Sequence, residues 1–111
     1  MATVLIIINR KQYMNSKQRA YLKGLAMTLE PVFQIGKGSI SPSLTEAIAE
    51  NLNKNEMIKI SVLNNCDDDP RKMAQILAER TGSEVVQVIG KKIVLYKKAK
   101  KDSKIDISKI K

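Results

Sequence analysis

The segment best suited to bind a ligand is Gly36-Lys37-Gly38-Ser39, a short basic turn. Two glycines let the backbone approach a ligand closely, and the helix expected after the turn presents unpaired N–H groups and a partial positive charge. Lys37 adds a formal positive charge at the tip. These features suit a phosphate group. A plain turn with an exposed lysine is the alternative interpretation.

The residues around this turn exclude two common nucleotide-binding motifs. A nucleotide P-loop requires glycine, four further residues and then Gly-Lys-Ser/Thr, and that spacing is absent. The dinucleotide fingerprint requires a third glycine at position 41, which is serine here. A short loop that clamps several backbone nucleotides, as in RNA-binding GXXG modules, fits best.

Further basic residues are candidate contacts with a nucleic-acid backbone. Lys91 and Lys92 follow Gly90 at a predicted hairpin turn, where they could reach phosphates. The other candidates are Lys17, Arg19, Lys23, Lys59 and Arg80. Taken singly, each of these side chains also fits an ordinary solvated surface charge, and the hairpin lysines also fit a turn that is basic only for solubility.

The residue inventory predicts neither catalysis nor a metal or cofactor site. The chain has no histidine, which removes the commonest general base and a common metal ligand. Cys66 is the single cysteine, so there is no disulfide framework or cysteine-rich zinc site. Helix capping accounts for Asp67–Asp69. We therefore expect a non-enzymatic protein without cofactors, in a reducing, cytoplasmic compartment.

The charge balance predicts an anionic partner. Twenty Lys and Arg residues against eleven Asp and Glu give a net charge of +9, with a pI near 9.8. RNA, DNA and acidic membrane are the candidates. The segment from Lys17 to Gly38 holds four basic residues and only one acid. No apolar run is long enough to span a bilayer, and we expect no membrane partner. Aromatic residues are 4% of the chain, so base stacking should be minor.

Hydrophobic periodicity and turn residues predict an α/β fold, in the form of an α+β-like sandwich. Ser16 is expected to cap a first helix that Pro31 stops, and Ser41-Pro42 to open a second. A third helix should begin at Asp67–Pro70 and end at Gly82. The expected strands are residues 32–35, 57–63, 84–89 and 92–97, the last two joined by a type II′ turn at Gly90-Lys91. This order predicts one αβαβαββ domain, with helices packed on a four-stranded mixed sheet.

The ends of the chain differ in composition from the predicted domain at residues 14–97. Met14 stands just before a helix-capping sequence. We expect residues 1–13 to be a non-native or flexible extension, added upstream in translation or cloning, with Met14 as the natural start. An additional edge strand is the alternative. Residues 98–111, rich in Lys, Asp and Ser, are expected to form a basic mobile tail.

Four blocks of residues resemble the CRM domain family, named for chloroplast RNA splicing and ribosome maturation. The blocks are Lys17-Gln18-Arg19, Leu22-Lys23-Gly24-Leu25-Ala26, Ile35-Gly36-Lys37-Gly38, and Val86–Lys91 with Val94-Leu95-Tyr96. The resemblance covers about residues 15 to 97. It implies a compact αβαβαββ fold similar to the C-terminal domain of translation initiation factor 3. The standalone bacterial members, the YhbY-like proteins, associate with precursors of the large ribosomal subunit and assist its assembly.

The resemblance places the family's RNA-contacting GxxG loop on Gly36, Lys37, Gly38 and Ser39. The fourth position departs from the usual glycine, because serine has a steric cost at positive φ, although its hydroxyl could donate to a phosphate. The expected function is recognition of structured RNA backbone by a monomer, with precursor large-subunit ribosomal RNA as the partner. The alternative is an adaptor that docks on ribosomal proteins and uses its charge only for steering.

Overall fold

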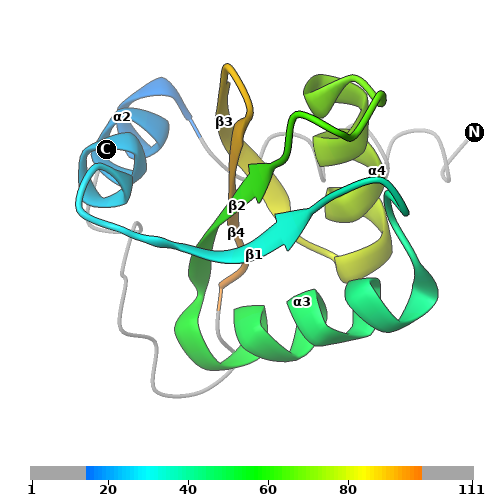
Figure 1. The fold of residues 1–111 in the computed structure, drawn as a ribbon. Coiled ribbons are helices and arrows are strands. Elements are labelled where there is room, and N and C mark those ends of the chain that lie inside the picture. Colours follow the sequence, from blue (N-terminus) through cyan, green and yellow to red (C-terminus); the bar gives the residue numbers. More distant parts are fainter. Residues whose placement is uncertain (1–14, 99–111) are drawn as a thin grey trace, which may run out of the picture.

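Residues 15–98 are described by the computed structural model (Figure 1). The predicted extension at residues 1–13, and the predicted tail at residues 98–111 except Lys98, lie outside this part of the chain. The elements are α2 Ser16–Ala26, β1 Pro31–Ile35, α3 Pro42–Asn55, β2 Met57–Val62, α4 Pro70–Thr81, β3 Glu84–Ile89 and β4 Lys92–Tyr96. The predicted αβαβαββ order is confirmed.

The four strands form one mixed sheet in the order β1-β2-β4-β3. β1 and β2 run parallel, as a strand–helix–strand unit requires, and β4 is antiparallel to both of its neighbours. The register has an irregularity between Pro31 and Phe33 in β1 and another between Val85 and Gln87 in β3. The four-stranded mixed sheet is therefore also confirmed.

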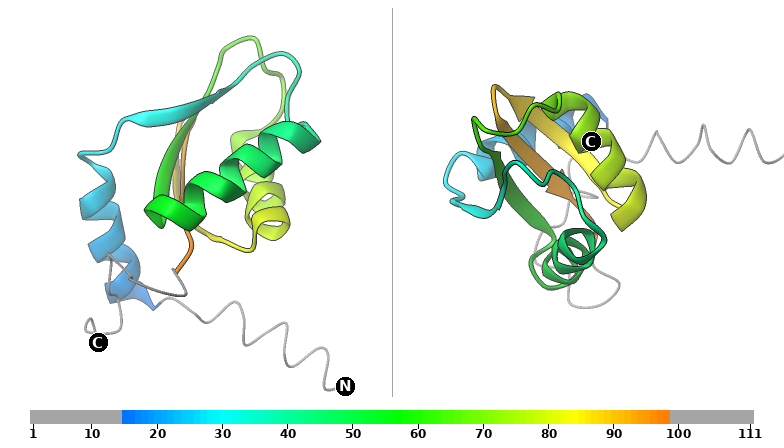
Figure 2. Two further views of the ribbon diagram at one scale, coloured as in Figure 1. Left: turned by 90° about the horizontal axis from the view of Figure 1, so that it is seen from below. Right: turned by 45° about the vertical axis from the view of Figure 1, so that its right-hand side comes forward.

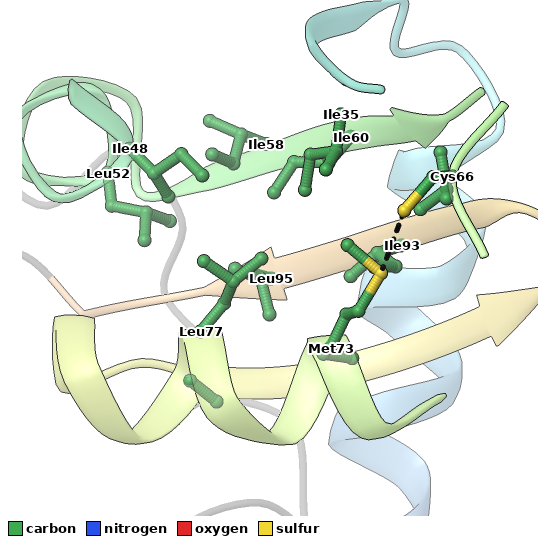
Figure 3. Packing of buried hydrophobic residues seen from close by; sticks show 13 residues of the cluster. Ile35, Ile48, Leu52, Ile58, Ile60, Cys66, Met73, Leu77, Ile93 and Leu95 are labelled. Atoms are coloured by element: carbon green, nitrogen blue, oxygen red, sulfur yellow. Dashed lines mark hydrogen bonds between the residues drawn. The ribbon is translucent and has the colours of Figure 1, made fainter. Parts of the chain in front are cut away.

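The helices cover the two faces of the sheet unequally, as Figures 1 and 2 show. On one face, α3 and α4 enclose the larger core, in which Ile48, Ile60 and Leu77 are fully buried (Figure 3). On the other face, α2 packs by itself through Leu22 and Ala26. The second face is consequently covered only in part.

The helix ends follow the expected local chemistry with one correction. Ser41 caps α3, with Pro42 in the first turn, and Asp69 caps α4. Gly82 ends α4 in the left-handed conformation, with φ of 70°. The prediction that Ser16 caps the first helix is wrong. Asn15 is the cap, because its side chain accepts the Gln18 N–H at 2.8 Å, while the Gln18 side chain accepts the Asn15 N–H at 3.0 Å.

The remaining boundaries shift by a few residues. α2 ends at Ala26, ahead of Pro31, which is instead the first residue of β1. At the hairpin turn Gly90 has φ of 56°, whereas Lys91 is not at positive φ, as a type II′ turn requires. Cys66 is 6% exposed, and its thiol donates to Met73 Sδ at 3.9 Å (Figure 3).

Candidate nucleic-acid interface

Three connections meet at one end of the strands. Because β1 and β2 are parallel, the loops that follow them leave the sheet at the same end. The turn between β3 and β4 lies at that end too. We call this region the loop end, made of residues 36–39, 63–69 and 90–91. Figure 2 (left) shows the loops after β1 and β2 side by side. We call the opposite end of the strands, where α3 and α4 finish, the far end.

Backbone hydrogen bonds tie the three connections of the loop end together. The Leu63 N–H donates to the Ile35 carbonyl at 2.8 Å, and the Val62 N–H donates to the Lys91 carbonyl at 2.7 Å. Lys91 Nζ also donates to Asn64 Oδ1 at 3.0 Å. The position of the Gly-Lys-Gly turn relative to the hairpin turn is therefore set by the central strand β2.

The two glycines of the turn have different roles. A Cβ atom at Gly36 would lie 3.2 Å from Asn65 Oδ1 and 3.5 Å from Leu63 Cδ1, so this glycine makes room for the neighbouring loop. A Cβ atom at Gly38 would meet nothing within 4 Å. Close approach by a ligand is thus a role for Gly38, whereas Gly36 serves internal packing.

Ser39 adopts the strained conformation expected from the sequence. Its φ is 54°, and its N–H closes the turn by donating to the Gly36 carbonyl at 2.9 Å. Its hydroxyl donates to Asp68 Oδ2 in the loop after β2. The hydroxyl, suggested above as a phosphate donor, is therefore engaged by a carboxylate in this structure, and it connects the two loops instead.

The N–H groups of Lys37 and Gly38 remain available. Within residues 15–98, neither group donates a hydrogen bond, and Lys37 Nζ has no partner either. The Lys37 side chain is exposed. The tip of the turn therefore offers two adjacent peptide donors beside one ammonium group, which is an arrangement suited to a phosphate oxygen.

The two hairpin lysines diverge. Lys91 extends to Asn64 in the loop end, whereas Lys92 Nζ crosses to Ser61 Oγ on β2 at 2.8 Å and so lies over the sheet. Lys59 is half-buried on the same side of the sheet, since it is two residues from Ser61. Positive charge thus continues from the loop end onto the part of the sheet that α2 leaves uncovered.

Three other predicted contacts lie away from the loop end. Lys17 and Lys23 are exposed on α2, which packs against the half of the sheet at the far end. Arg80 is exposed in the last turn of α4, at the far end itself. The structure does not bring these side chains together with Lys37, and their proposed contacts stay predictions.

The Arg19 side chain makes its hydrogen bonds within the protein. Its Nη1 donates to the carbonyls of Val85 and Val86, at the irregularity of β3, and thereby ties α2 to the edge of the sheet. Burial raises the pKa of the neighbouring Glu84 carboxyl above its ordinary value, and the Arg19 guanidinium partly opposes that rise. The geometry gives Arg19 a structural role, which sequence reasoning did not foresee.

We expect Arg19→Ala to lower the free energy of unfolding by about 1 to 2 kcal/mol, because the part-buried carbonyls of Val85 and Val86 lose a charged donor. Lys23→Ala, one turn along the same helix, should change it by less than about 0.5 kcal/mol. Urea unfolding followed by circular dichroism measures both. Unchanged stability together with a shallower salt dependence of RNA binding in Arg19→Ala would instead assign Arg19 to the RNA.

Sequence reasoning missed two basic residues near the loop end. Arg71 and Lys72 are exposed in the first turn of α4, directly after the loop that contains Asp68. Their signal is positional: they follow Pro70 at the start of a helix whose preceding strand is parallel to β1. The sheet order was needed to see that this helix start shares an edge with the Gly-Lys-Gly turn.

The described residues also bear on metal sites and membrane-spanning helices. From Asn15 to Lys98, no group of three or more His, Cys, Asp or Glu side chains is placed to hold a metal ion. No helix in that range combines the length and apolarity needed to cross a membrane.

Comparison with known proteins places this architecture among related sequences. Residues 14–97 match the CRS1 / YhbY (CRM) domain. A Bacillus subtilis (strain 168) protein named "Probable RNA-binding protein YqeI" is 40% identical over 94 residues, which are 85% of this chain and 98% of the relative. An "RNA-binding protein" of Haemophilus influenzae is 31% identical over 84 residues, covering 76% of this chain and 85% of the relative.

A solved structure shows the same fold. The solution structure of the hypothetical protein SAV1595 from Staphylococcus aureus, whose suggested role is RNA binding, matches with a TM-score of 0.72 and 43% sequence identity. The match covers 84% of this chain and 97% of that one. Since sequence and fold agree over nearly the whole described region, the chain belongs to the CRS1 / YhbY (CRM) domain family.

Proposed function

We propose that this chain is an RNA-binding protein, without catalytic activity, that holds the phosphate backbone of structured RNA at its loop end. The observation that carries the proposal is the tip of the turn. There the N–H groups of Lys37 and Gly38 are without partners, Gly38 faces open space, and the Lys37 ammonium is exposed. The names of the family and of its relatives support RNA as the polymer.

The carboxylates of the loop end restrict the direction from which RNA approaches. Asp68 accepts the Ser39 hydroxyl, and Asp69 caps α4 by accepting the Arg71 N–H at 3.1 Å. A phosphate on that side of the turn would meet like charge. We therefore expect RNA to approach from the side of Lys37 and Gly38. Lys91 and the uncovered part of the sheet extend the basic surface beyond these two residues.

The finer identity of the RNA comes from the family resemblance. We infer that the partner is ribosomal RNA in precursors of the large subunit, and that a cytoplasmic monomer assists subunit assembly. Co-sedimentation of the protein with precursor particles, but not with mature large subunits, would support this role. Co-sedimentation with mature subunits alone would contradict it.

Lys37→Ala should weaken binding to a large-subunit ribosomal RNA fragment and lower the slope of log K against log salt by about 1, because one phosphate contact is lost. Fluorescence anisotropy across a salt series measures both quantities. Lys54→Ala is the matched control, since Lys54 is exposed in the last turn of α3 at the far end. Equal and feeble binding by parent and Lys37→Ala would favour the adaptor that docks on ribosomal proteins.

A further inference from the structure

Within residues 15–98, half of one sheet face is left uncovered by helices. α2 lies over the half at the far end (Figure 1). Its buried residues Leu22 and Ala26 belong to the cluster on that part of the sheet. Toward the loop end the same face carries side chains over which none of the described helices α2, α3 and α4 lies. This open face consists of Gln34 on β1, Lys59 and Ser61 on β2, Lys92 on β4, and Gln87 and Ile89 on β3.

The register places four of these side chains in one row across the sheet. Gln34 is paired with Ser61, Ser61 with Lys92, and Lys92 with Ile89. Lys59 and Gln87 form the next row, on either side of Val94. The bond from Lys92 Nζ to Ser61 Oγ shows that these side chains share a face. The row begins two residues before Gly36, so the open face is continuous with the loop end.

The chemistry of the open face is neutral hydrogen bonding combined with positive charge. Among Gln34, Lys59, Ser61, Gln87, Ile89 and Lys92 there are two amides, a hydroxyl, two ammonium groups and one exposed apolar side chain, and no carboxylate. The carboxylates nearest along the strands are Glu30 and Glu84, which both lie toward the far end. The face also has no aromatic side chain: Phe33 lies on the opposite side of β1, and Tyr96 is buried beneath α2. The open face therefore suits the polar, anionic backbone of a nucleic-acid strand, but it cannot stack on bases.

We propose that the open face hydrogen-bonds to the ribose 2′-hydroxyls of the strand whose phosphates the loop end holds, and thereby distinguishes RNA from DNA. This inference rests on the proposed function. Phosphate contacts at Lys37 and Gly38 are the same for both nucleic acids, so discrimination requires another group. The 2′-hydroxyl both donates and accepts, and glutamine amides do the same.

Gln34 and Gln87 are the side chains that make this contact. Gln34 is exposed and Gln87 is half-buried, and within residues 15–98 neither amide has a hydrogen-bond partner. Ser61 is 7% exposed and already accepts Lys92, so it serves to hold that lysine over the sheet. Lys92 and Lys59 then keep the strand close while the two amides contact its sugars.

The test compares an RNA hairpin with a DNA hairpin of the same sequence, by fluorescence anisotropy at fixed salt. The parent should prefer RNA. Alanine at both Gln34 and Gln87 should weaken RNA binding about tenfold, leave DNA binding unchanged and leave the salt slope unchanged, because two uncharged hydrogen bonds are lost. Gln75→Ala, at an exposed glutamine on α4, is the matched control and should bind both as the parent does.

Other outcomes separate this inference from the proposed function. Equal losses for RNA and DNA in the Gln34 and Gln87 variant, no loss at all, or a parent without RNA preference would overturn 2′-hydroxyl contact. The phosphate site would still stand if Lys37→Ala weakened both nucleic acids. A parent that binds neither hairpin would overturn both proposals. Thermal melting of the variants confirms that a loss of binding is not a loss of folding.

Discussion

Replacing Lys37, Lys91 and Lys92 together by alanine should weaken RNA binding about 100-fold at moderate salt. Each exposed ion contact contributes up to about 1 kcal/mol, and three such contacts give up to about 3 kcal/mol, or about two powers of ten. The slope of log K against log salt should fall by about 2 to 3, because each lost phosphate contact releases one counterion fewer. Anisotropy across a salt series measures both values.

The control variant for this prediction removes the same amount of positive charge from the far end. Lys54, Arg80 and Lys98 are exposed and lie where α3, α4 and β4 finish, so this variant also tests the contact that the sequence predicted for Arg80. Their triple alanine variant loses the same three positive charges but should bind RNA within a few-fold of the parent, since distant surface charge is screened beyond about 10 Å. Equal weakening of both variants would show that net charge alone governs binding, and would remove the site from the loop end.

Much of this fold was predictable because local chemistry and tertiary packing agree. Ser41-Pro42 and Gly82 set helix ends by interactions within a few residues, so sequence reasoning located them correctly. Apolar spacing indicated where the helices lie, and Gly90 identified the hairpin turn. The Gly-Lys-Gly turn was found in the same way, since strand, turn and helix start are contiguous in the chain.

The missed features depend on contacts between distant residues. The guanidinium of Arg19 ends on carbonyls 66 and 67 positions later, at a strand irregularity that no local pattern reveals. The hydroxyl of Ser39 finds Asp68 only because β1 and β2 are parallel neighbours. The separation of Arg80 from the loop end likewise follows from the direction of α4. Sheet order, and not residue type, decides which of the basic side chains share a surface.

The second large effect is expected at the helix that lies apart from the loop end. Leu22→Ala should lower the free energy of unfolding by about 3 kcal/mol, because Leu22 is 0% exposed and its truncation leaves a cavity among Met57, Val86, Val94 and Tyr96. Urea unfolding followed by circular dichroism measures this loss. Tyr21→Ala is the control on the same helix, at a side chain 42% exposed, and should cost less than about 1 kcal/mol.

RNA binding by Leu22→Ala distinguishes a supporting helix from a contacting one. The loop end is built by β1, β2 and β4 with their connections, and none of the hydrogen bonds described for it above involves α2. RNA affinity, measured where the variant is still folded, should therefore stay within about twofold of the parent. A much larger loss of affinity from a folded variant would mean that α2 presents Lys17 and Lys23 to the RNA, so that the interface would include both the loop end and the outer surface of this helix.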